Sequence, residues 1–445
     1  MEKYRLFADE SVGVHPFIPV ACMQAQLTPA VSMTSRLSAL FKVGLRGLAG
    51  AVLVPLRCSL LLLAALWLLV LQSVLLLLLP FPYLRWRAAL VLQKLPLRLA
   101  LFALGILRIR ERRADFRRLK IRAPSCPDKD QAAAAPWRAL ISLPSLSGAA
   151  RERAGGKGSN IGADQQQQIS RCCICLCSFT CLVEPLYAAY RLSPRFALLH
   201  AEGGFSFVSL PQMLLYSLQF ELPTGRGRYS DLSQLLAAHA AATSPCIPIV
   251  LFPEGQKSNG QCLLTWQQQQ DAGAAGTAGA AAACSVTNNR KRQEGKGGNS
   301  NGFDEAALRI LDGRIAELGC MYNAEDSTEE TRLRKGKRVP YGIPHTVYSP
   351  TKHLLYALAE WQHPLLAVWA TPADVQACLQ QQKQAAAAGK SSSGAAASGG
   401  TLLLLREVMV RMLPGRTPVI KSGADLAPFS KYWERTQREQ YLKTE

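Results

Sequence analysis

A short polar turn follows an apolar strand pattern in the middle of the chain and carries the residues best suited to chemistry. The segment Val250–Gly260 reads VLFPEGQKSNG. Pro253 cannot donate to an interior ladder, so the strand should end there and deliver Glu254 at its carboxyl end. Gly255 and the Ser-Asn-Gly sequence let the backbone fold sharply beside that carboxylate, and Lys257 adds a cation. Ligands bind at this edge of an open α/β sheet. Such a turn could also have no function other than to end the strand.

The segments around this turn alternate between strand and helix patterns. Short apolar runs bounded by turn residues predict strands, and longer runs with helical spacing predict helices. Such alternation is typical of an α/β sheet. The expected elements are a strand and turn at Ser170–Glu184, a helix at Pro185–Arg191, an apolar segment with a Gly pair at Phe196–Leu210, helices near Gln212–Phe220 and Tyr229–Ala242, and the strand that ends at Phe252.

An N-terminal apolar run predicts contact with a membrane. Cys58–Leu79 has 22 residues without a charge, enough to cross a bilayer core of about 30 Å. It lies too far from the start for a signal peptide, and Pro80–Pro82 then breaks the helix. A second apolar stretch, Ala88–Leu107, contains Lys94 and Arg98, and a cation at mid-bilayer is costly. The two stretches could form a hairpin that returns to the cytosolic side with its second arm in the interface, or the first could be a single span.

The net charge of +20 is concentrated beside these apolar segments. Residues 1–122 carry 18 Lys and Arg against 5 Asp and Glu. Cations that flank hydrocarbon-length runs suit anionic lipid headgroups. The sequence contains no zinc finger, RNA-recognition signature or basic-zipper heptad, so we expect membrane lipids and not nucleic acid as partners. Nothing in the sequence points to a particular protein partner.

Five of the 13 cysteines lie within Cys172–Cys181, which reads CCICLCSFTC. They alternate with apolar residues, and this pattern indicates a buried strand in which Cys acts as a small hydrophobe. A zinc site would need separated Cys pairs or His residues at regular spacing. We therefore expect no metal site and a reducing, cytosolic environment for this part of the chain.

Three tracts rich in small and polar residues interrupt the chain, at 131–168, 267–301 and 380–400. They lack the large apolar residues that offset the entropy of ordering, so we expect them to be insertions in surface loops. The predicted organisation is a basic N-terminal region at 1–57, a membrane segment or hairpin at 58–107, a domain at 169–373 that contains the second insertion, and a helical segment at 401–445 that completes the domain.

The order of these elements, with FPEGQKSNG at its centre and a hydrophobic hairpin ahead of it, resembles the glycerophosphate and lysophospholipid acyltransferase family. The resemblance covers residues 170–266, continues more weakly over 314–373 and includes the terminal SKYWERTQREQY. It implies an α/β fold with a mixed sheet flanked by helices. It also implies transfer of a fatty acyl group to a lysophospholipid such as lysophosphatidic acid, with acyl-coenzyme A as co-substrate and no tightly bound cofactor.

In that family a His and an acid five residues later form the catalytic pair. The His takes a proton from the acceptor hydroxyl, and the carboxylate fixes its tautomer. The corresponding segment here is SFTCLVE, which places Glu184 at the acid position and Phe179, which cannot accept a proton, at the His position. A second family block is matched by GFSFVSL, which begins at Gly204 and has Leu210 in place of the Arg that grips the acceptor phosphate.

Three other histidines are candidates for the base. His200 lies near the second block but no acid follows it at the required spacing, whereas His345 and His353 lie in a later segment where surface or structural roles are expected. Two hypotheses follow. The protein could be an acyltransferase of the endoplasmic reticulum membrane with a cytosolic domain. It could instead be an inactive lipid-binding or scaffold protein of the endoplasmic reticulum or lipid droplet on the same fold.

The third family block, the FPEG turn, matches best. In the family it helps to hold the glycerol and phosphate of the acceptor. The resemblance implies that Glu254 accepts hydrogen bonds from hydroxyl groups, that Gly255 permits close approach and that Lys257 replaces part of the missing cation. The predicted substrate-binding residues are Phe252, Pro253, Glu254, Gly255, Lys257, Asn259 and Gly204.

Overall fold

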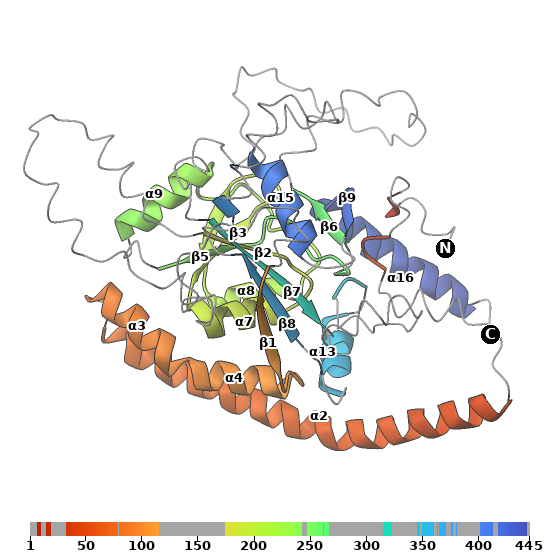
Figure 1. Cartoon of the computed structure of the whole chain (residues 1–445). Coiled ribbons are helices and arrows are strands. Elements are labelled where there is room, and N and C mark those ends of the chain that lie inside the picture. The colour runs from red at the N-terminus through yellow and green to blue at the C-terminus, as the bar shows by residue number, and fades with distance from the viewer. Residues whose placement is uncertain are drawn as a thin grey trace, which may run out of the picture.

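A seven-stranded mixed sheet runs through the centre of the protein (Figure 1). The computed structural model describes residues 7–9, 15–18, 33–78, 80–114, 174–242, 247–260, 262–266, 315–322, 345–347, 349–359, 363, 365–370, 375–376, 380, 401–412 and 417–442. The strands lie in the order β1 (Ile109–Arg113), β8 (Leu365–Ala370), β7 (Ile315–Tyr322), β2 (Ile174–Cys177), β5 (Ile249–Leu251), β3 (Arg195–Leu199) and β4 (Phe205–Val208). The four strands β7, β2, β5 and β3 are parallel, so their carboxyl ends meet at one edge.

Helices cover both faces of this sheet, and the central strands β2 and β5 are buried along their whole length. On β2, Ile174 and Leu176 face one apolar core while Cys175 and Cys177 face the other. One core lies under α9 (Leu232–Ala242) and α15 (Thr401–Met412). The other lies under α4 (Lys94–Ala103), α7 (Val183–Leu192), α8 (Leu210–Ser217) and α13 (Pro350–Ala359). The result is a layered α/β fold (Figure 1).

A smaller parallel sheet of β6 (Cys262–Thr265) and β9 (Thr417–Ser422) packs beside the main one. The terminal helix α16 (Leu426–Leu442) follows a short turn of 3-10 helix, Gly423–Asp425. Its Phe429 and Trp433 form a third core with Phe17 near the N-terminus. The C-terminal segment that the sequence predicted to be helical therefore contains a strand as well.

The predicted α/β architecture is confirmed at the level of sheets flanked by helices. The apolar segment with the Gly pair forms the antiparallel hairpin of β3 and β4. One strand, β1, was not predicted. It lies directly after the second apolar stretch and pairs with β8 at the edge of the sheet. The tracts at 131–168 and 267–301, and all but residue 380 of the tract at 380–400, lie outside the described residues.

The N-terminal apolar run is part of a much longer helix, α2 (Met33–Leu76). Within the described chain, one segment is long and apolar enough to span a membrane, and it is the 27 residues Gly50–Leu76 of this helix. After a break at Pro80, α3 (Pro82–Leu92) and α4 follow, and α4 packs back along α2. The chain thus makes a helical hairpin whose second arm is interrupted.

One stripe of α2 packs against the protein and the rest of its surface is exposed. The packed side chains recur every three or four residues, as expected for one helix face, and include Val54, Arg57, Leu61, Ala64, Leu68 and Leu75. Arg57 Nη1 donates to the carbonyl oxygen of Leu358 in α13 at 2.8 Å. In α4, Arg98 donates to the carbonyl oxygens of Ile106 and Leu107 at 2.8 and 2.7 Å, so its cation holds the segment that follows the helix.

The docking of α2 on α13 predicts a specific cross-link. A Cβ built on Gly50 lies 3.6 Å from Cβ of Ala359, within the range of about 3.5–4.5 Å that a disulfide requires. We expect the pair Gly50→Cys and Ala359→Cys to form a disulfide on mild oxidation in membranes, seen as a shift on non-reducing gels.

The control pairs Gly50→Cys with Thr351→Cys, an exposed position about 12 Å further along α13. Each single variant shows any background from native cysteines. Equal cross-linking of both pairs, or none in the first, would contradict the docking.

Candidate functional site

The FPEG turn lies at the carboxyl end of β5, next to the carboxyl end of β2. Gly255 has a φ of 70°, a left-handed conformation that suits glycine, and its carbonyl oxygen accepts a hydrogen bond from the Tyr216 hydroxyl at 2.6 Å. Phe252, Glu254 and Lys257 are buried. Burial raises the pKa of Tyr216 and keeps its phenol neutral. The turn is therefore placed where the sequence predicted it and is held inside the protein.

Through its carboxylate, Glu254 connects its own turn to two other segments of the chain. Oε1 accepts the backbone N–H of Phe179 at 3.1 Å, and Oε2 accepts the backbone N–H of Leu264 at 2.9 Å. The side chain is 2% exposed. Its charge also attracts the guanidinium of Arg406, although burial is the larger influence and lowers the pKa of that group. The sequence assigned this carboxylate to substrate hydroxyl groups, and that assignment stays a prediction beside the structural bonds seen here.

Lys257 does not face Glu254 as the sequence suggested. Its Nζ donates to the carbonyl oxygens of Ser217 and Gln219 and lies 3.2 Å from Nδ1 of His345. Ser217 ends α8, so the cation sits at the negative end of a helix dipole. Burial lowers the pKa of Lys257 to about 7. The turn therefore projects its carboxylate and its cation in different directions.

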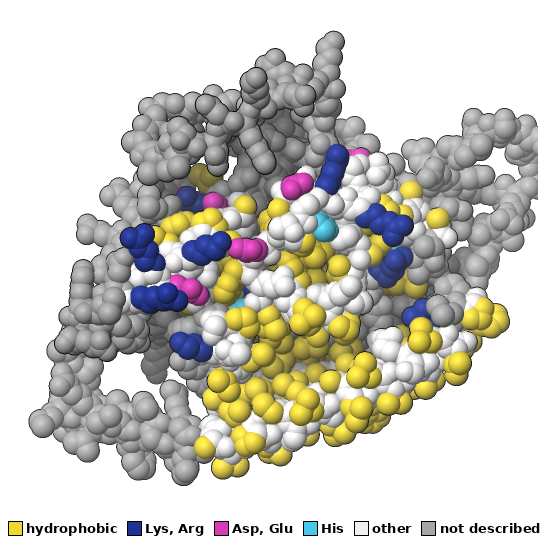
Figure 2. All heavy atoms as spheres, turned by 180° about the vertical axis from the view of Figure 1, so that it is seen from behind, with side chains coloured by type: hydrophobic (Ala, Val, Ile, Leu, Met, Phe, Trp, Pro, Cys, Tyr) yellow, Lys and Arg dark blue, Asp and Glu magenta, His cyan; other side chains and the backbone are white. Residues whose placement is uncertain are grey.

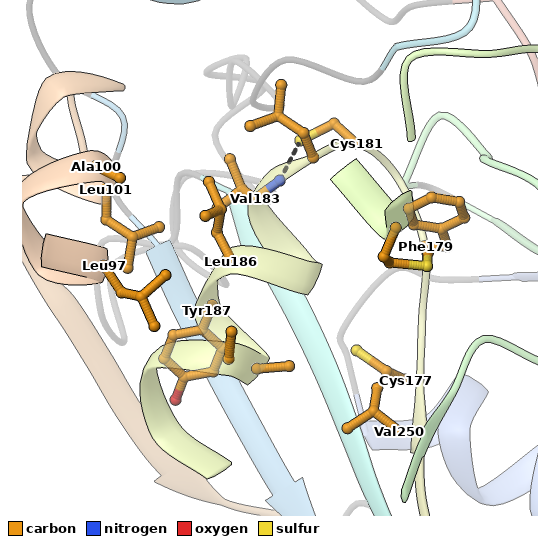
Figure 3. Close-up of a cluster of buried hydrophobic side chains, with 14 of the residues drawn as sticks. Leu97, Ala100, Leu101, Cys177, Phe179, Cys181, Val183, Leu186, Tyr187 and Val250 are labelled. Atoms are coloured by element: carbon orange, nitrogen blue, oxygen red, sulfur yellow. Dashed lines mark hydrogen bonds between the residues drawn. The ribbon is translucent and has the colours of Figure 1, made fainter. Parts of the chain in front are cut away.

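The loop after β2 carries Phe179 and Glu184. Phe179 is fully buried and packs on Phe252, with ring centroids 4.8 Å apart; Figure 3 shows it among the apolar side chains of this loop and the adjoining strands. The carboxylate of Glu184 accepts hydrogen bonds from the Thr180 hydroxyl and from the backbone N–H of Cys181, the latter at 3.0 Å. Glu184 thus stabilises the first turn of α7, and the position of Phe179 offers no base.

Gly204 and Leu210 lie on either side of β4. Gly204 has a φ of 80°, and an added Cβ would lie only 2.6 Å from the carbonyl oxygen of Tyr229, so a side chain does not fit. Leu210 begins α8 and packs partly against the core that also holds Phe179. These residues therefore build the hairpin and the start of the helix, and no guanidinium stands at the position of Leu210.

Asn259 ties the FPEG turn to the N-terminal part of the chain. Its Nδ2 donates to the carbonyl oxygens of His15 and Ile18 at 2.8 and 3.1 Å. Pro253 lies between the buried Phe252 and Glu254. All the predicted binding residues except Gly204 thus lie in one turn, and Gly204 lies on the neighbouring hairpin.

Two histidines far away in sequence approach the loop that carries Phe179. The backbone N–H of His345 donates to the carbonyl oxygen of Thr180 at 3.0 Å. The ring of His345 stacks on that of His353, with centroids 4.2 Å apart. Both rings are buried, so the surface location that the sequence offered as one alternative is wrong, and a structural role stays a prediction. No local pattern could have shown this approach, because about 170 residues separate His345 from Thr180.

A small apolar pocket opens beside this loop. Its walls come from the end of α4, the start of α7, α13 and the residue at 363; the lining residues are Leu104, Ile106, Cys181, Leu182, Val183, His353, Ala357 and His363. His353 and His363 are its only polar side chains apart from the thiol. The pocket has a volume of about 10 Å³, room for about one water-sized group, and its surface is almost entirely apolar.

Cysteines of the CCICLCSFTC segment lie in the apolar core. Cys175, Cys177 and Cys181 are buried there, as predicted for small hydrophobic residues, while Cys172 and Cys173 lie outside the described residues. Among the described residues no group of three or more His, Cys, Asp or Glu side chains is arranged to hold a metal ion.

His200 forms a hydrogen bond elsewhere. Its Nε2 lies 2.7 Å from Oγ of Ser206 on the hairpin of β3 and β4. Burial is the main cause that lowers its pKa. This histidine is therefore engaged on the hairpin.

Replacing Glu254 should destabilise the fold strongly. Glu254→Gln keeps the shape but turns an amide N–H₂ toward one of two backbone N–H donors, so we expect a loss of about 2–4 kcal/mol in the free energy of unfolding. Denaturant titration in detergent measures it. Glu221→Gln is the matched control, because Glu221 is exposed and pairs with Lys431 on the surface, where such changes cost about 0–1 kcal/mol. Equal effects of both would contradict the structural role of Glu254.

Lys257 should make the stability depend on pH. Between about pH 7 and pH 10.5 the unfolded protein binds a proton at this lysine that the folded protein has released, so the free energy of unfolding rises with pH. The rise from one group is at most about 1.4 kcal/mol per pH unit.

Lys257→Met should remove this rise from unfolding curves measured at several pH values in that range. Lys431→Met, at an exposed lysine, should leave it unchanged. A rise of the same slope in Lys257→Met would show that Lys257 does not cause it and would contradict the lowered pKa.

The FPEG turn and the SFTCLVE loop lie together at the carboxyl edge of the sheet. Comparisons of the chain with family models, with curated proteins and with solved structures found no match.

Proposed function

We propose that this protein is a membrane-bound acyltransferase that moves a fatty acyl group from acyl-coenzyme A to a lysophospholipid such as lysophosphatidic acid. One observation carries the proposal. The SFTCLVE loop and the FPEG turn, which the resemblance assigns to one active site, are joined by the hydrogen bond between the N–H of Phe179 and Glu254. They meet at the carboxyl ends of adjacent parallel strands, where α/β sheets place their ligands.

An exposed apolar surface supports a membrane location. Figure 2 shows hydrophobic side chains over a broad band of the protein that continues into the central body. Exposed apolar side chains on α2, α3, α4 and the turn between α2 and α3 include Leu62, Leu66, Leu69, Leu77, Phe81, Leu84, Val91, Leu95 and Phe102. A surface of this size is unfavourable in water and suits lipid acyl chains. We place the protein at the endoplasmic reticulum, with the α/β domain on the cytosolic side.

The way α2 packs favours a helix that lies along the membrane surface. Gly50 and Arg57 touch α13, while Ala64 and Leu75 lie on the buried stripe. A helix that crosses a bilayer is surrounded by lipid through most of its length, whereas this helix keeps one side on the α/β domain. The opposite side can then enter one leaflet, and a lysophospholipid can reach the pocket from the bilayer without crossing water.

The proposed chemistry requires a nucleophile, a base and a dry cavity. The acceptor hydroxyl attacks the thioester carbonyl carbon, and the coenzyme A thiol leaves. Acyl-coenzyme A acts as co-substrate, and the proposal includes no tightly bound cofactor. The apolar walls at Leu104, Leu182 and Val183 would exclude water from the reacting groups.

A second candidate function is lipid binding without catalysis. The observation that favours it is the full burial of Phe179 against Phe252 and Tyr216, because an aromatic core residue stands where the family has its base. In this alternative the protein keeps the fold and the membrane surface as a scaffold of the endoplasmic reticulum or of lipid droplets.

Transfer of labelled acyl groups from acyl-coenzyme A to lysophosphatidic acid tests the proposal. We expect measurable turnover by the purified protein in lipid vesicles. Leu210→Arg should lower the KM for lysophosphatidic acid about 10-fold or more, because a guanidinium restores a bidentate phosphate contact. The matched control is Leu215→Arg on the same helix, at a side chain that is 63% exposed.

The outcomes separate the two candidates. Absence of transfer by a folded protein that still binds the vesicles would reject the acyltransferase and favour the scaffold. Equal effects of the two Arg substitutions would show that general attraction to an anionic lipid, and not a clamp at Leu210, lowers the KM.

A further inference from the structure

We propose that His353 is the proton acceptor in this acyl transfer, in place of the histidine that Phe179 replaces. The inference rests on the proposed function and names one of its catalytic residues. It follows from three features of His353: its place beside the loop that lacks a base, its position in the pocket wall and a ring nitrogen that has no partner.

The first feature is its location. His353 lies on α13, and its ring stacks on His345 with centroids 4.2 Å apart. The backbone N–H of His345 is bonded to the carbonyl oxygen of Thr180, the residue after Phe179. The fold therefore brings an imidazole from a distant segment to the loop in which the family carries its own.

The second feature is the pocket. His353 lines it together with Cys181, Leu182 and Val183, which lie between Phe179 and Glu184 in sequence. The pocket has a volume of about 10 Å³, room for about one water-sized group, so an acceptor hydroxyl that enters it would lie against the start of α7 and against the imidazole. A base needs this direct access to the hydroxyl, at about 2.6–3.2 Å or through one water molecule.

The third feature is the state of the ring. His353 is 1% exposed, and its Nδ1 has no hydrogen-bond partner among the described residues. A buried polar atom without a partner is costly, so such atoms in native proteins call for an explanation. A ligand hydroxyl that donates to Nδ1 would supply the missing bond.

The electrostatic surroundings keep this imidazole neutral. Burial is the main cause that lowers the pKa of His353, and the positive groups of His345, Lys257 and His363 lower it further. A neutral ring can accept a proton, whereas a protonated one cannot. The phosphate of a bound lysophospholipid would offset these positive groups and would make the ring more basic when the acceptor is present.

The other buried histidines are less suited to the role. Nδ1 of His345 lies 3.2 Å from both Lys257 Nζ and the Ser217 carbonyl oxygen. Nε2 of His363 lies 3.1 Å from the carbonyl oxygen of Ala357. His239 lies on the opposite face of the sheet, with its Nε2 2.9 Å from the carbonyl oxygen of Ile247. His353 alone among these four has a ring nitrogen that is both buried and without a partner in the described structure.

The proposed step balances in protons and bonds. His353 takes the hydroxyl proton as the acceptor oxygen forms a bond to the thioester carbonyl carbon. The bond from carbon to sulfur then breaks, and the imidazolium returns the proton to the leaving thiolate. The products are the acylated lipid and free coenzyme A, and His353 is neutral again.

The test uses the full-length protein in vesicles, with acyl transfer from acyl-coenzyme A to lysophosphatidic acid as the assay. We expect His353→Gln to lower kcat by about 10²–10⁴-fold with little change in KM, because general-base catalysis contributes about that factor. In His353→Ala, added imidazole should restore part of the lost rate, since it can occupy the space of the ring. His239→Gln, a buried histidine outside the pocket, should keep the wild-type kcat.

Each outcome decides the question. Wild-type kcat in His353→Gln would overturn the assignment of the base and leave the acyltransferase standing. A loss of activity that imidazole does not restore, together with a lower melting temperature, would make His353 a structural residue and also overturn the assignment. If wild-type protein binds vesicles but transfers no acyl group, the proposed function itself fails, and the role of His353 fails with it.

Discussion

The buried carboxylate of Glu254 is the interaction on which the arrangement of the site depends. Its two oxygens accept the N–H groups of Phe179, in the loop after β2, and of Leu264, within β6. Removing a carboxylate from water is costly, and charge-assisted bonds from otherwise unpaired donors offset that cost. The backbone of Gly423 also lies so close that an added Cβ would be 2.5 Å from the Glu254 carbonyl oxygen. The turn is therefore closed by the C-terminal part of the chain, and its carboxylate organises the site from within.

Local pattern predicts the central part of this fold well and long-range packing poorly. Alternation in the segment that holds Cys175 and Cys177 predicts β2, because it depends on near neighbours, whereas the apolar segment with the Gly pair was not predicted to be the hairpin of β3 and β4. The strand β1 was missed, since its charged sequence IRERR gains stability only from pairing with β8 and from contacts such as that between Glu111 and the Tyr187 hydroxyl. The direction of Lys257 was also missed, because carbonyl oxygens at the end of α8 attract it and no residue adjacent in sequence shows this.

The same limit applies to the membrane segment and to the histidines. Composition reveals that Gly50–Leu76 is apolar, but only the packed stripe shows that one side of α2 belongs to the protein. The residues of that stripe are spaced three and four apart. Inside a run of leucines, however, the packed and the exposed faces of the helix are about equally hydrophobic, so the spacing cannot be recognised from the sequence. The role that we propose for His353 depends on the path of the chain between α13 and the loop after β2, and no motif of local spacing includes both.

The positive charge beside the loop that carries Phe179 bears on both the lipid acceptor and the proposed base. None of the described carboxylates forms an ion pair with Lys257, whose cation is held by carbonyl oxygens and by the face of the Phe220 ring, 4.8 Å away. Neutral groups of this kind orient a cation without cancelling its charge, but burial lowers the pKa of Lys257 to about 7, so near neutral pH only its protonated fraction adds a positive potential near His345 and His353. In a low-dielectric interior that potential is unfavourable by itself and becomes favourable when an anion approaches. A lipid phosphate would supply such an anion. Burial lowers the basicity of His353 when no acceptor is bound. The same burial would strengthen the effect of an anionic acceptor, whose charge would raise that basicity.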